Sequence, residues 1–378
     1  MNLVRLLNWM SSRMKLVNFS IKKLAEKRRH KMAKKEDTKE KVTKDPSFLS
    51  PCGLDVGTMN LVSAFLSKPN DDKNNPNTRR IRNNYLHLDN PEDFDVKRYS
   101  HVVIEGETYI LGEDAFKLGN VFNKEVSRCM KAGLIAAGEL EGMDVVSAMI
   151  HSLIGKGDGK KKCVYSVPAD PIDRTIDNKY HEQFFGRVLS NLGWVPQPMN
   201  EALAVVYAEL SDNDRTGIAI SYGAGMSNIC IAYQGVVVEQ FSVAVGGDWI
   251  DRSSANMANV ATNRITALKE KPEFNIMNPT HPKKDIRRRM EIIADYYKAM
   301  IDQVGSHIQQ RFGNVTAQFP DEIPIVISGG TSMANGFVQA MEEILSEYEY
   351  PFDISEIRHA KDPMYAVAKG CLIEALRV

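Results

Sequence analysis

Cysteine is scarce in this sequence, and its five cysteines lie far apart, at Cys52, Cys129, Cys163, Cys230 and Cys371. An odd number, with no CxxC pair and no histidine cluster nearby, argues against a disulfide framework and a zinc site. It indicates reduced thiols in a cytosol. No stretch reaches the roughly 18 consecutive apolar residues of a membrane-spanning helix. No compact apolar core with a small-residue cleavage site marks a secretory signal. We therefore expect a cytoplasmic protein.

Net charge is also absent, because 48 Lys and Arg balance 48 Asp and Glu. The two signs are unevenly distributed: residues 1–48 hold 14 basic and 5 acidic residues, so they carry +9 and the rest of the chain carries −9. A mildly acidic body is not typical of a protein that binds nucleic acid directly. The length of 378 residues, with 43% hydrophobic and 25% charged residues, indicates a soluble globular protein of two or three domains.

Residues 1–48 form a separate basic extension and linker. Apolar residues recur at alternating spacings of four and three between Leu3 and Leu24, which predicts an amphipathic helix. A basic helix of this kind suits an anionic membrane surface, and the same spacing suits a coiled coil or a partner helix. A third interpretation is that translation starts at Met32, so that residues 1–31 are not translated. Residues 31–47 are rich in charge and resemble a solvated linker.

Three glycine-containing turns are the strongest local signals. "GLDVGT" (residues 53–58) lies between two strands, "SYGAG" (221–225) repeats this strand–turn–strand pattern, and "SGGT" (328–331) joins a strand to a helix. Glycine at such tips lets backbone N–H groups approach phosphate oxygens. Each turn taken alone is more often an ordinary turn. The recurrence of the hairpin about 170 residues later predicts two related domains that face one ligand.

The motifs in their order point to a family. "GLDVGT", "NEALAVVYAEL", "SYGAG", "VAVGGDWID", "VISGGTS" and "KGCLIEAL" together resemble the actin, heat-shock chaperone and sugar-kinase ATPase superfamily, and within it the bacterial actins of the MreB and MamK type. The resemblance covers residues 50–378. It implies an α/β fold, a two-domain actin-like clamp of duplicated ribonuclease-H-like domains behind the basic N-terminal helical extension. The first domain would comprise 49–216 and 352–378, with a small inserted subdomain at 86–135, and the second domain 217–351.

The resemblance further implies that ATP and Mg²⁺ bind between the two domains. The residues that it assigns to nucleotide binding are Gly57, Thr58, Met59, Asn60, Ser221, Gly223, Ala224, Gly225, Ser227, Lys269, Glu270, Gly329, Gly330 and Thr331. Asp55 would face the metal through water, because Mg²⁺ dehydrates reluctantly. Glu201 would polarise the attacking water. The alternatives are a helix N-terminal acid for Glu201 and an exposed charge pair for Lys269 and Glu270.

One position departs from the superfamily's pattern. The second phosphate loop normally begins with an aspartate that helps to hold the metal's waters, and Ser221 stands there instead. Serine supplies no charge. We therefore expect weaker Mg²⁺ affinity or slower hydrolysis, with nucleotide binding retained.

The resemblance implies a filament-forming, cytoskeletal ATPase. A nucleotide that contacts both domains favours the closed clamp, and closure would set the fit between copies stacked head to tail. The alternatives are a non-polymerising actin-fold ATPase switch and a reactivating or chaperone-type module. Independently of the family, apolar periodicity predicts one long amphipathic helix over 284–312.

Overall fold

The computed structural model describes residues 50–68, 71–73, 75–122, 124–135, 140–175, 178–312 and 322–377. The chain divides into two compact units, residues 1–45 and 46–378, and the described residues all belong to the second. The predicted basic helix and linker of residues 1–48 lie outside them. Within the described part of the chain, no helix is long and apolar enough to cross a membrane.

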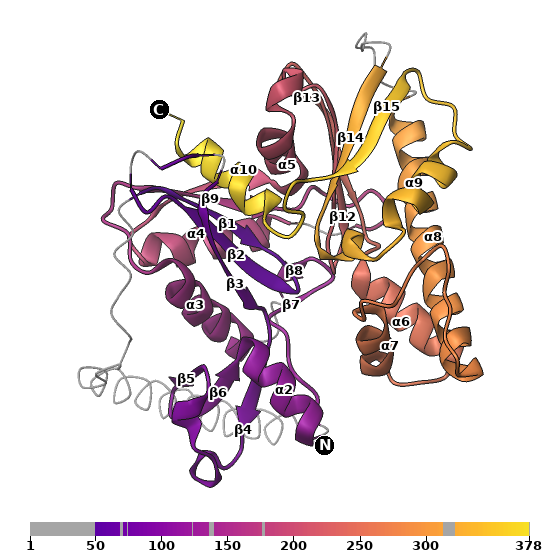
Figure 1. The fold of residues 1–378 in the computed structure, drawn as a ribbon. Coiled ribbons are helices and arrows are strands. Elements are labelled where there is room, and N and C mark those ends of the chain that lie inside the picture. The colour runs from indigo at the N-terminus through magenta and orange to yellow at the C-terminus, as the bar shows by residue number, and fades with distance from the viewer. Residues whose placement is uncertain are drawn as a thin grey trace, which may run out of the picture. The chain divides into compact units, whose positions relative to one another are not determined.

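Two five-stranded sheets form the framework of this unit (Figure 1). The first sheet has the order β10-β9-β1-β2-β3, with β1 (Cys52–Val56), β2 (Asn60–Phe65), β3 (Asn77–Arg82), β9 (Lys162–Val167) and β10 (Val195–Asn200). The second sheet has the order β13-β12-β11-β14-β15, with β11 (Gly217–Tyr222), β12 (Ser227–Tyr233), β13 (Val236–Val243), β14 (Glu322–Ser328) and β15 (Asp353–His359). In both sheets three antiparallel strands are followed by two strands added in parallel. This repeat confirms the predicted α/β, duplicated fold.

The last strand corrects one expected domain boundary. The sequence analysis assigned the chain from residue 352 onward to the first domain, but β15 pairs in parallel with β14 in the second sheet. Ile354 and Ile357 of β15 pack against the hydrophobic core of the second sheet. This burial keeps the strand there, so the chain returns to the first sheet only after His359.

Two helices lie between the sheets. They are α5 (Glu201–Glu209) and α10 (Ala366–Ala375), and one buried cluster joins them to both sheets through residues such as Val164 and Cys230. The backbones approach closely at two glycines. A Cβ added to Gly370 of α10 would lie 1.8 Å from the carbonyl oxygen of Ala204 in α5, and one added to Gly53 of β1 would lie 2.1 Å from that of Ala368. Helix α10 is therefore held between β1 and α5.

The remaining helices cover the outer faces of the sheets. Helices α3 (Leu140–Ile154) and α4 (Lys179–Asn191) pack against the first sheet. Helices α6 (Gly247–Ala258), α7 (Thr262–Lys269), α8 (Lys284–Phe312) and α9 (Phe337–Leu345) share a core with the second. Helix α8 has the bounds that the apolar periodicity predicted, and its buried side chains recur at spacings of three and four. Between the long elements lies a short 3₁₀ helix, η3 (Ser211–Asn213).

The residues expected to form an inserted subdomain contain a three-stranded sheet of order β4-β6-β5. Its elements are β4 (Tyr85–Leu88), β5 (His101–Ile104), β6 (Glu107–Leu111), the 3₁₀ helices η1 (Pro91–Asp93) and η2 (Val96–Arg98), and helix α2 (Gly112–Phe122). Leu86, Ile110 and Leu118 form its own small core. A two-stranded sheet follows, β7 (Met130–Lys131) with β8 (Leu134–Ile135), and it brings the chain back toward the centre of the unit (Figure 1).

Candidate functional site

The three glycine-containing turns line one cleft, with a volume of about 670 Å³. This volume is within the range of small-molecule sites. The turns lie between β1 and β2, between β11 and β12, and in the 3₁₀ helix η4 (Gly330–Met333) after β14. The predicted residues that line the cleft are Asp55, Gly57, Thr58, Met59, Asn60, Glu201, Ser221, Gly223, Ala224, Gly225, Lys269, Glu270, Gly329, Gly330 and Thr331.

Ser227 is the exception among the predicted residues. It is fully buried in β12, and its hydroxyl donates to the carbonyl oxygen of Val245 at 2.8 Å. Ser227 therefore fixes the segment that leads into α6 and does not face the cleft. The assignment failed because successive side chains of a strand point to opposite faces, and Ser227 is the first residue of β12.

The first two turns meet across the cleft. A Cβ added to Gly225 would lie 2.1 Å from the backbone nitrogen of Gly133 and 2.7 Å from Oγ1 of Thr58. Only glycine fits here, because any side chain would collide with backbone. The turn of the first sheet and the turn of the second sheet thus lie against each other at the base of the cleft.

The second turn is held from behind. The N–H groups of Gly247 and Asp248 at the start of α6 donate to the carbonyl oxygens of Gly223 (3.0 Å) and Ala224 (2.8 Å). The hydroxyl of Thr331 in η4 also donates to the carbonyl of Gly223, at 2.9 Å. These contacts leave the turn little freedom. The helix start and η4 both lie directly beside it, so three separate segments build one wall.

The carboxylate of Asp55 lies at the end of β1. Ser166 at the end of β9 donates its hydroxyl to Oδ1 of Asp55 at 2.9 Å and accepts the N–H of Val56 at 2.9 Å. Burial raises the pKa of Asp55 to about 7, although the hydrogen bond from Ser166 opposes the shift. A cation in the cleft would favour the ionised form of this carboxyl.

Glu201 begins α5 and points toward the second sheet. Asn200 caps the helix by accepting the N–H of Leu203 at 3.0 Å. The side chain of Glu201 accepts from the hydroxyl of Ser221 at 3.4 Å and from the amide of Asn228. Burial and the nearby Asp55 raise the pKa of Glu201, whereas the two hydrogen bonds lower it. Two carboxyls that repel each other and two neutral hydrogen-bonding groups therefore form the floor of the cleft.

Ser221 and Asp55 occupy equivalent positions in the two hairpins. Asp55 is the second-to-last residue of β1, and Ser221 is the second-to-last residue of β11. Each is followed by one apolar residue and then by glycine. Because the two sheets have the same topology, Ser221 occupies in the second sheet the place that Asp55 occupies in the first.

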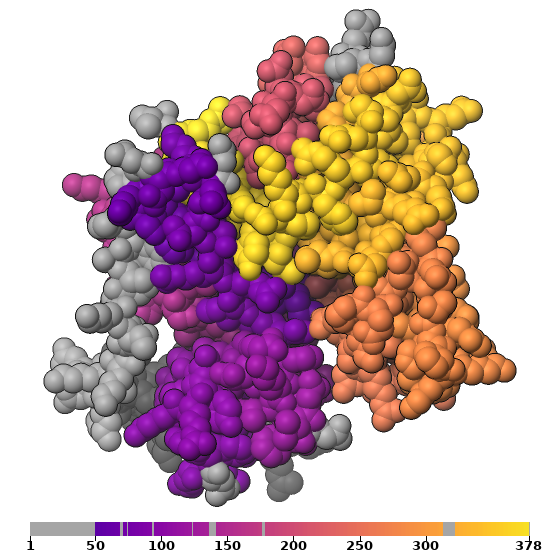
Figure 2. Space-filling view, viewed as in Figure 1, coloured from indigo at the N-terminus to yellow at the C-terminus, as the bar shows by residue number. Residues whose placement is uncertain are grey.

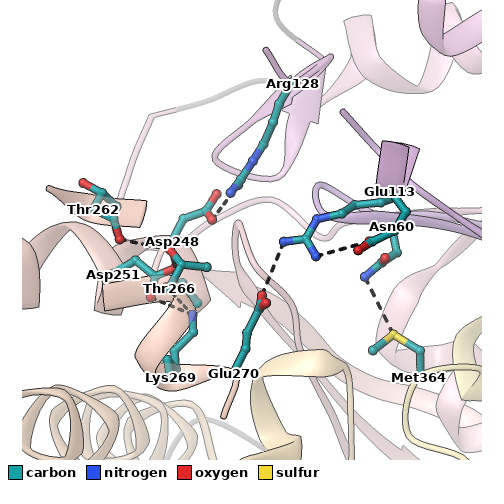
Figure 3. Close-up of polar contacts among 12 residues, drawn as sticks. Asn60, Glu113, Arg128, Asp248, Asp251, Thr262, Thr266, Lys269, Glu270 and Met364 are labelled. Carbon is teal, nitrogen blue, oxygen red and sulfur yellow. Dashed lines mark hydrogen bonds and ion pairs between the residues drawn. The ribbon is translucent and has the colours of Figure 1, made fainter. Parts of the chain in front are cut away.

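Ion pairs connect the rim of the cleft (Figure 3). Arg82 of β3 lies 3.4 Å from Glu270, which follows α7, and 3.8 Å from Glu113 of α2. Arg128 lies 2.6 Å from Asp248 of α6. The first pair joins β3 to the end of α7, and the second joins the segment just before β7 to the start of α6.

Lys269 lines the cleft but is largely buried, so it is not part of an exposed charge pair. Its ammonium group lies 2.8 Å from the buried carboxylate of Asp251 and donates to the carbonyl of Gly247 at 3.1 Å. A buried ion pair of this kind anchors α7 to α6. Removal of only one of its two partners would destabilise the protein, because the other charge would stay buried and unpaired. Lys269 and Glu270 both line the cleft, so each combines a structural contact with access to a ligand.

Sequence reasoning missed Ser166, Asn228, Arg82, Arg128 and Asp248. The signal for Asn228 was present, because a β11–β12 hairpin centred on the glycine turn places it directly opposite Ser221. No comparable signal exists for Ser166, whose position depends on the parallel pairing of β1 with β9. The two arginines act across the cleft, at long range in the sequence.

The donors at the floor fit a hard cation carried by a phosphate ligand. Carboxylate and hydroxyl oxygens are the ligands that Mg²⁺ prefers, and Mg²⁺ usually keeps several waters. Among the described residues, no group of three or more His, Cys, Asp or Glu is placed to hold a metal ion. Asp55 and Glu201 are the acidic groups at the floor of the cleft that could hold such a cation.

Comparisons with known proteins agree with this architecture. A family model described as Volactin matches residues 51–375, and no curated protein matches the sequence. The MamK double helical filament is similar with a TM-score of 0.62 at 17% identity, over 86% of this chain and 98% of that one. A non-polymerising MamK mutant bound to AMPPNP has a TM-score of 0.51 at 17% identity, over the same shares. The ethanolamine utilization protein EutJ from Carboxydothermus hydrogenoformans has a TM-score of 0.52 at 15% identity, over 85% and 89%. The fold is actin-like.

Proposed function

The chain belongs to the volactin family, and on that premise we propose that it is an actin-like ATPase whose two halves close on Mg-ATP and which assembles head to tail into filaments. One observation carries the proposal. The glycine turns of two duplicated sheets meet in one cleft, with Asp55 and Glu201 at its floor. A ligand with several phosphate oxygens would contact both turns at once, and such contacts are complete only when the halves are close together.

The cleft has the groups that phosphoryl transfer to water requires. Backbone N–H groups of the two turns would hold the phosphates, Asp55 would orient waters around Mg²⁺, and the metal would neutralise charge that develops on the phosphates. Glu201 would orient the attacking water. The amide of Asn228 and the hydroxyl of Ser221 hold its carboxylate in place, so its direction is set before the nucleotide binds.

Gly329, Gly330 and Thr331 would contact adenosine, and Lys269 with Glu270 would contact ribose. Support for the adenosine position comes from the cleft wall, where Gly330 and Met364 lie side by side, so a flat ring would contact glycine backbone and a thioether there. Glu270 is held from across the cleft by Arg82. Binding of ribose hydroxyls to Glu270 would therefore compete with or reinforce the Arg82–Glu270 ion pair, which joins the two walls of the cleft.

Assembly is supported by fold and by analogy. One relative of the same fold is a double helical filament, MamK. We propose that this chain forms cytoplasmic filaments and that residues 1–31, where translated, attach them to a membrane surface or to a partner helix. The first domain would comprise residues 49–216 and the end of the chain after β15, and the second domain the residues between them.

The test is sedimentation and electron microscopy of the full chain with Mg²⁺ and ATP, ADP or no nucleotide, together with phosphate release. We expect filaments that depend on ATP, and hydrolysis that Glu201→Gln slows by about 10²-fold or more. A chain that binds ATP but stays monomeric at high concentration would contradict the filament proposal and favour a nucleotide switch. Filaments that form equally without nucleotide would favour a scaffold.

A further inference from the structure

Besides the cleft, the described unit has a second hollow of about 680 Å³. We call it the acidic groove. It is formed by residues 342–357, which run from the end of α9 to the first part of β15. This segment contains six acidic residues and no Lys, Arg or His. Its strand, β15, is the outermost strand of the second sheet, so the groove lies at an edge where backbone groups are available for pairing.

The aromatic wall of the acidic groove is rigid. The hydroxyl of Tyr348 donates to the carboxylate oxygen Oδ1 of Asp302 at 2.6 Å, and that of Tyr350 donates to the carbonyl of Gly305 at 3.3 Å. Both anchor the wall to α8. The ring of Tyr350 stacks on Phe352 with centroids 5.5 Å apart. A groove that is formed in advance and lined by tyrosine is typical of the binding surfaces where few residues supply most of the affinity.

The charge of the groove comes from exposed carboxylates. Glu342, Glu349 and Asp353 are all exposed. Glu356 also lines the groove, but Arg358 lies 3.1 Å from it and neutralises it in part. An apolar side chain flanked by positive charges would therefore complement this groove in both shape and charge.

The same chain carries such a surface at another place. We call residues 252–264, from α6 into α7, the basic tip. They include Arg252 and Arg264, both exposed, and no acid. Met257 projects there with 68% of its surface exposed. Methionine is flexible and polarisable, and fills apolar hollows well.

The groove and the tip lie at opposite ends of the part built on the second sheet. In Figure 1, β15 and β14 begin at the upper right, and α6 and α7 lie at the lower right. Figure 2 shows the same separation between the yellow upper surface and the orange lower surface. A tip therefore cannot enter the groove of its own chain.

From these observations we infer that the basic tip of one copy docks in the acidic groove of the next copy. Met257 would enter between the tyrosines, and Arg252 and Arg264 would approach Glu349 and Asp353. Because tip and groove are different patches, the contact is heterologous and repeats from copy to copy as an open chain. The inference rests on the proposed assembly and assigns the residues that make its longitudinal contact.

Charge reversal tests it. Arg252→Glu/Arg264→Glu reverses the tip, Glu349→Lys/Asp353→Lys reverses the groove, and Lys97→Glu/Arg98→Glu on η2 is the matched control. With Mg-ATP, the protein concentration at which filaments sediment should be at least tenfold higher for the tip variant and for the groove variant than for wild type. The control variant should behave like wild type. An equimolar mixture of the tip and groove variants should assemble again, because every contact in an alternating chain is then complementary.

Binding of a fluorescent ATP analogue checks that each variant is folded, and Met257→Asp gives a second tip variant if one fails. Wild-type assembly with unimpaired tip variants would overturn this inference and leave the proposed function intact, as would a mixture that fails to assemble. A wild-type chain that binds nucleotide but never assembles would instead overturn the filament proposal and this inference with it.

Discussion

The contact between the two connecting helices gives a prediction with a magnitude. In Gly370→Ala, the new Cβ would lie 1.8 Å from the carbonyl oxygen of Ala204, whereas real Cβ contacts are essentially never under 3.0 Å. Helices α5 and α10 would have to separate by at least about 1.2 Å. Helix α10 has little room to do so, because Ala368 on it already lies against Gly53 of β1.

The energetic balance follows from two opposing terms. Alanine in place of glycine inside a helix gains about 1 kcal/mol of helix propensity. Overpacking a close-packed core costs about 1–3 kcal/mol, and the cost here should be near 3 because the obstacle is a backbone carbonyl that cannot rotate away. We therefore expect Gly370→Ala to lower the free energy of unfolding by about 2 kcal/mol.

The assay is urea-induced unfolding of the full chain, followed by tryptophan fluorescence. Gly186→Ala in α4 is the matched control, because a Cβ there would meet only the hydroxyl end of Tyr165, at 3.1 Å. The midpoint should fall for Gly370→Ala and stay equal or rise for Gly186→Ala. Equal midpoints for the two variants would refute the reasoning that close backbone contact joins the connecting helices.

Three further predictions concern the site and its surroundings. Glu201→Gln should retain ATP binding and lower the rate of phosphate release by about 10²-fold or more; an unchanged rate would remove Glu201 from the chemistry. Burial lowers the pKa of His181 to about 3, so the unfolded chain binds a proton near pH 6.5 that the folded chain rejects. Stability should fall by up to about 1.4 kcal/mol per pH unit as pH drops from 6.5 toward 3, and unfolding of His181→Asn should be less sensitive to pH over that range. Arg128→Ala should weaken closure by removing the ion pair with Asp248, which faster release of a fluorescent ATP analogue would reveal.

Local signals in the sequence predicted most of the framework. The two hairpins were predictable because glycine turns and alternating apolar residues lie close together in the chain, and α8 because its apolar stripe repeats over 29 residues. Which of the two sheets β15 joins could not be predicted from local signals. Its partner β14 precedes it by a helix and two loops, and the segment before it carries an acidic, aromatic pattern that suits either sheet.

The residues of the candidate site also divide into those with a local sequence signal and those positioned by long-range contacts. Gly57 and Gly225, which the resemblance assigned to nucleotide binding, line the cleft, and at each of them an added Cβ would collide with other backbone. Ser166 and Arg82 reach the site only through parallel strand pairing and through the approach of two distant segments. Local patterns contain no information on such contacts, since they form only when the whole chain packs.

The duplication explains what the cleft lacks and how to restore it. In the first sheet, the hydroxyl of Ser166 donates to Asp55 at 2.9 Å. In the second sheet, Ser328 is paired in register with Ser221. The hydroxyl of Ser328 is buried and makes no hydrogen bond within the described part of the chain. The second sheet thus has a serine donor, Ser328, in the same place as Ser166 of the first sheet. The carboxylate to which this hydroxyl would donate is missing, because position 221 is a serine.

Ser221→Asp should therefore gain a ready partner in Ser328, with a charge-assisted hydrogen bond that contributes about 1.5–3 kcal/mol. Without a cation, the new carboxylate would repel Glu201 and Asp55, so the melting temperature in EDTA should fall. With ATP, the Mg²⁺ concentration for half-maximal hydrolysis should drop about tenfold, which corresponds to about 1.4 kcal/mol, because three carboxylates now hold the metal's waters. Asparagine has the shape of aspartate without its charge, so Ser221→Asn should change neither the melting temperature in EDTA nor the Mg²⁺ dependence. Adding Ser328→Ala to Ser221→Asp should cancel part of the drop in the required Mg²⁺ concentration. An aspartate variant with the Mg²⁺ dependence and rate of wild type would show that position 221 does not act on the metal, and Ser221 would then be a neutral replacement.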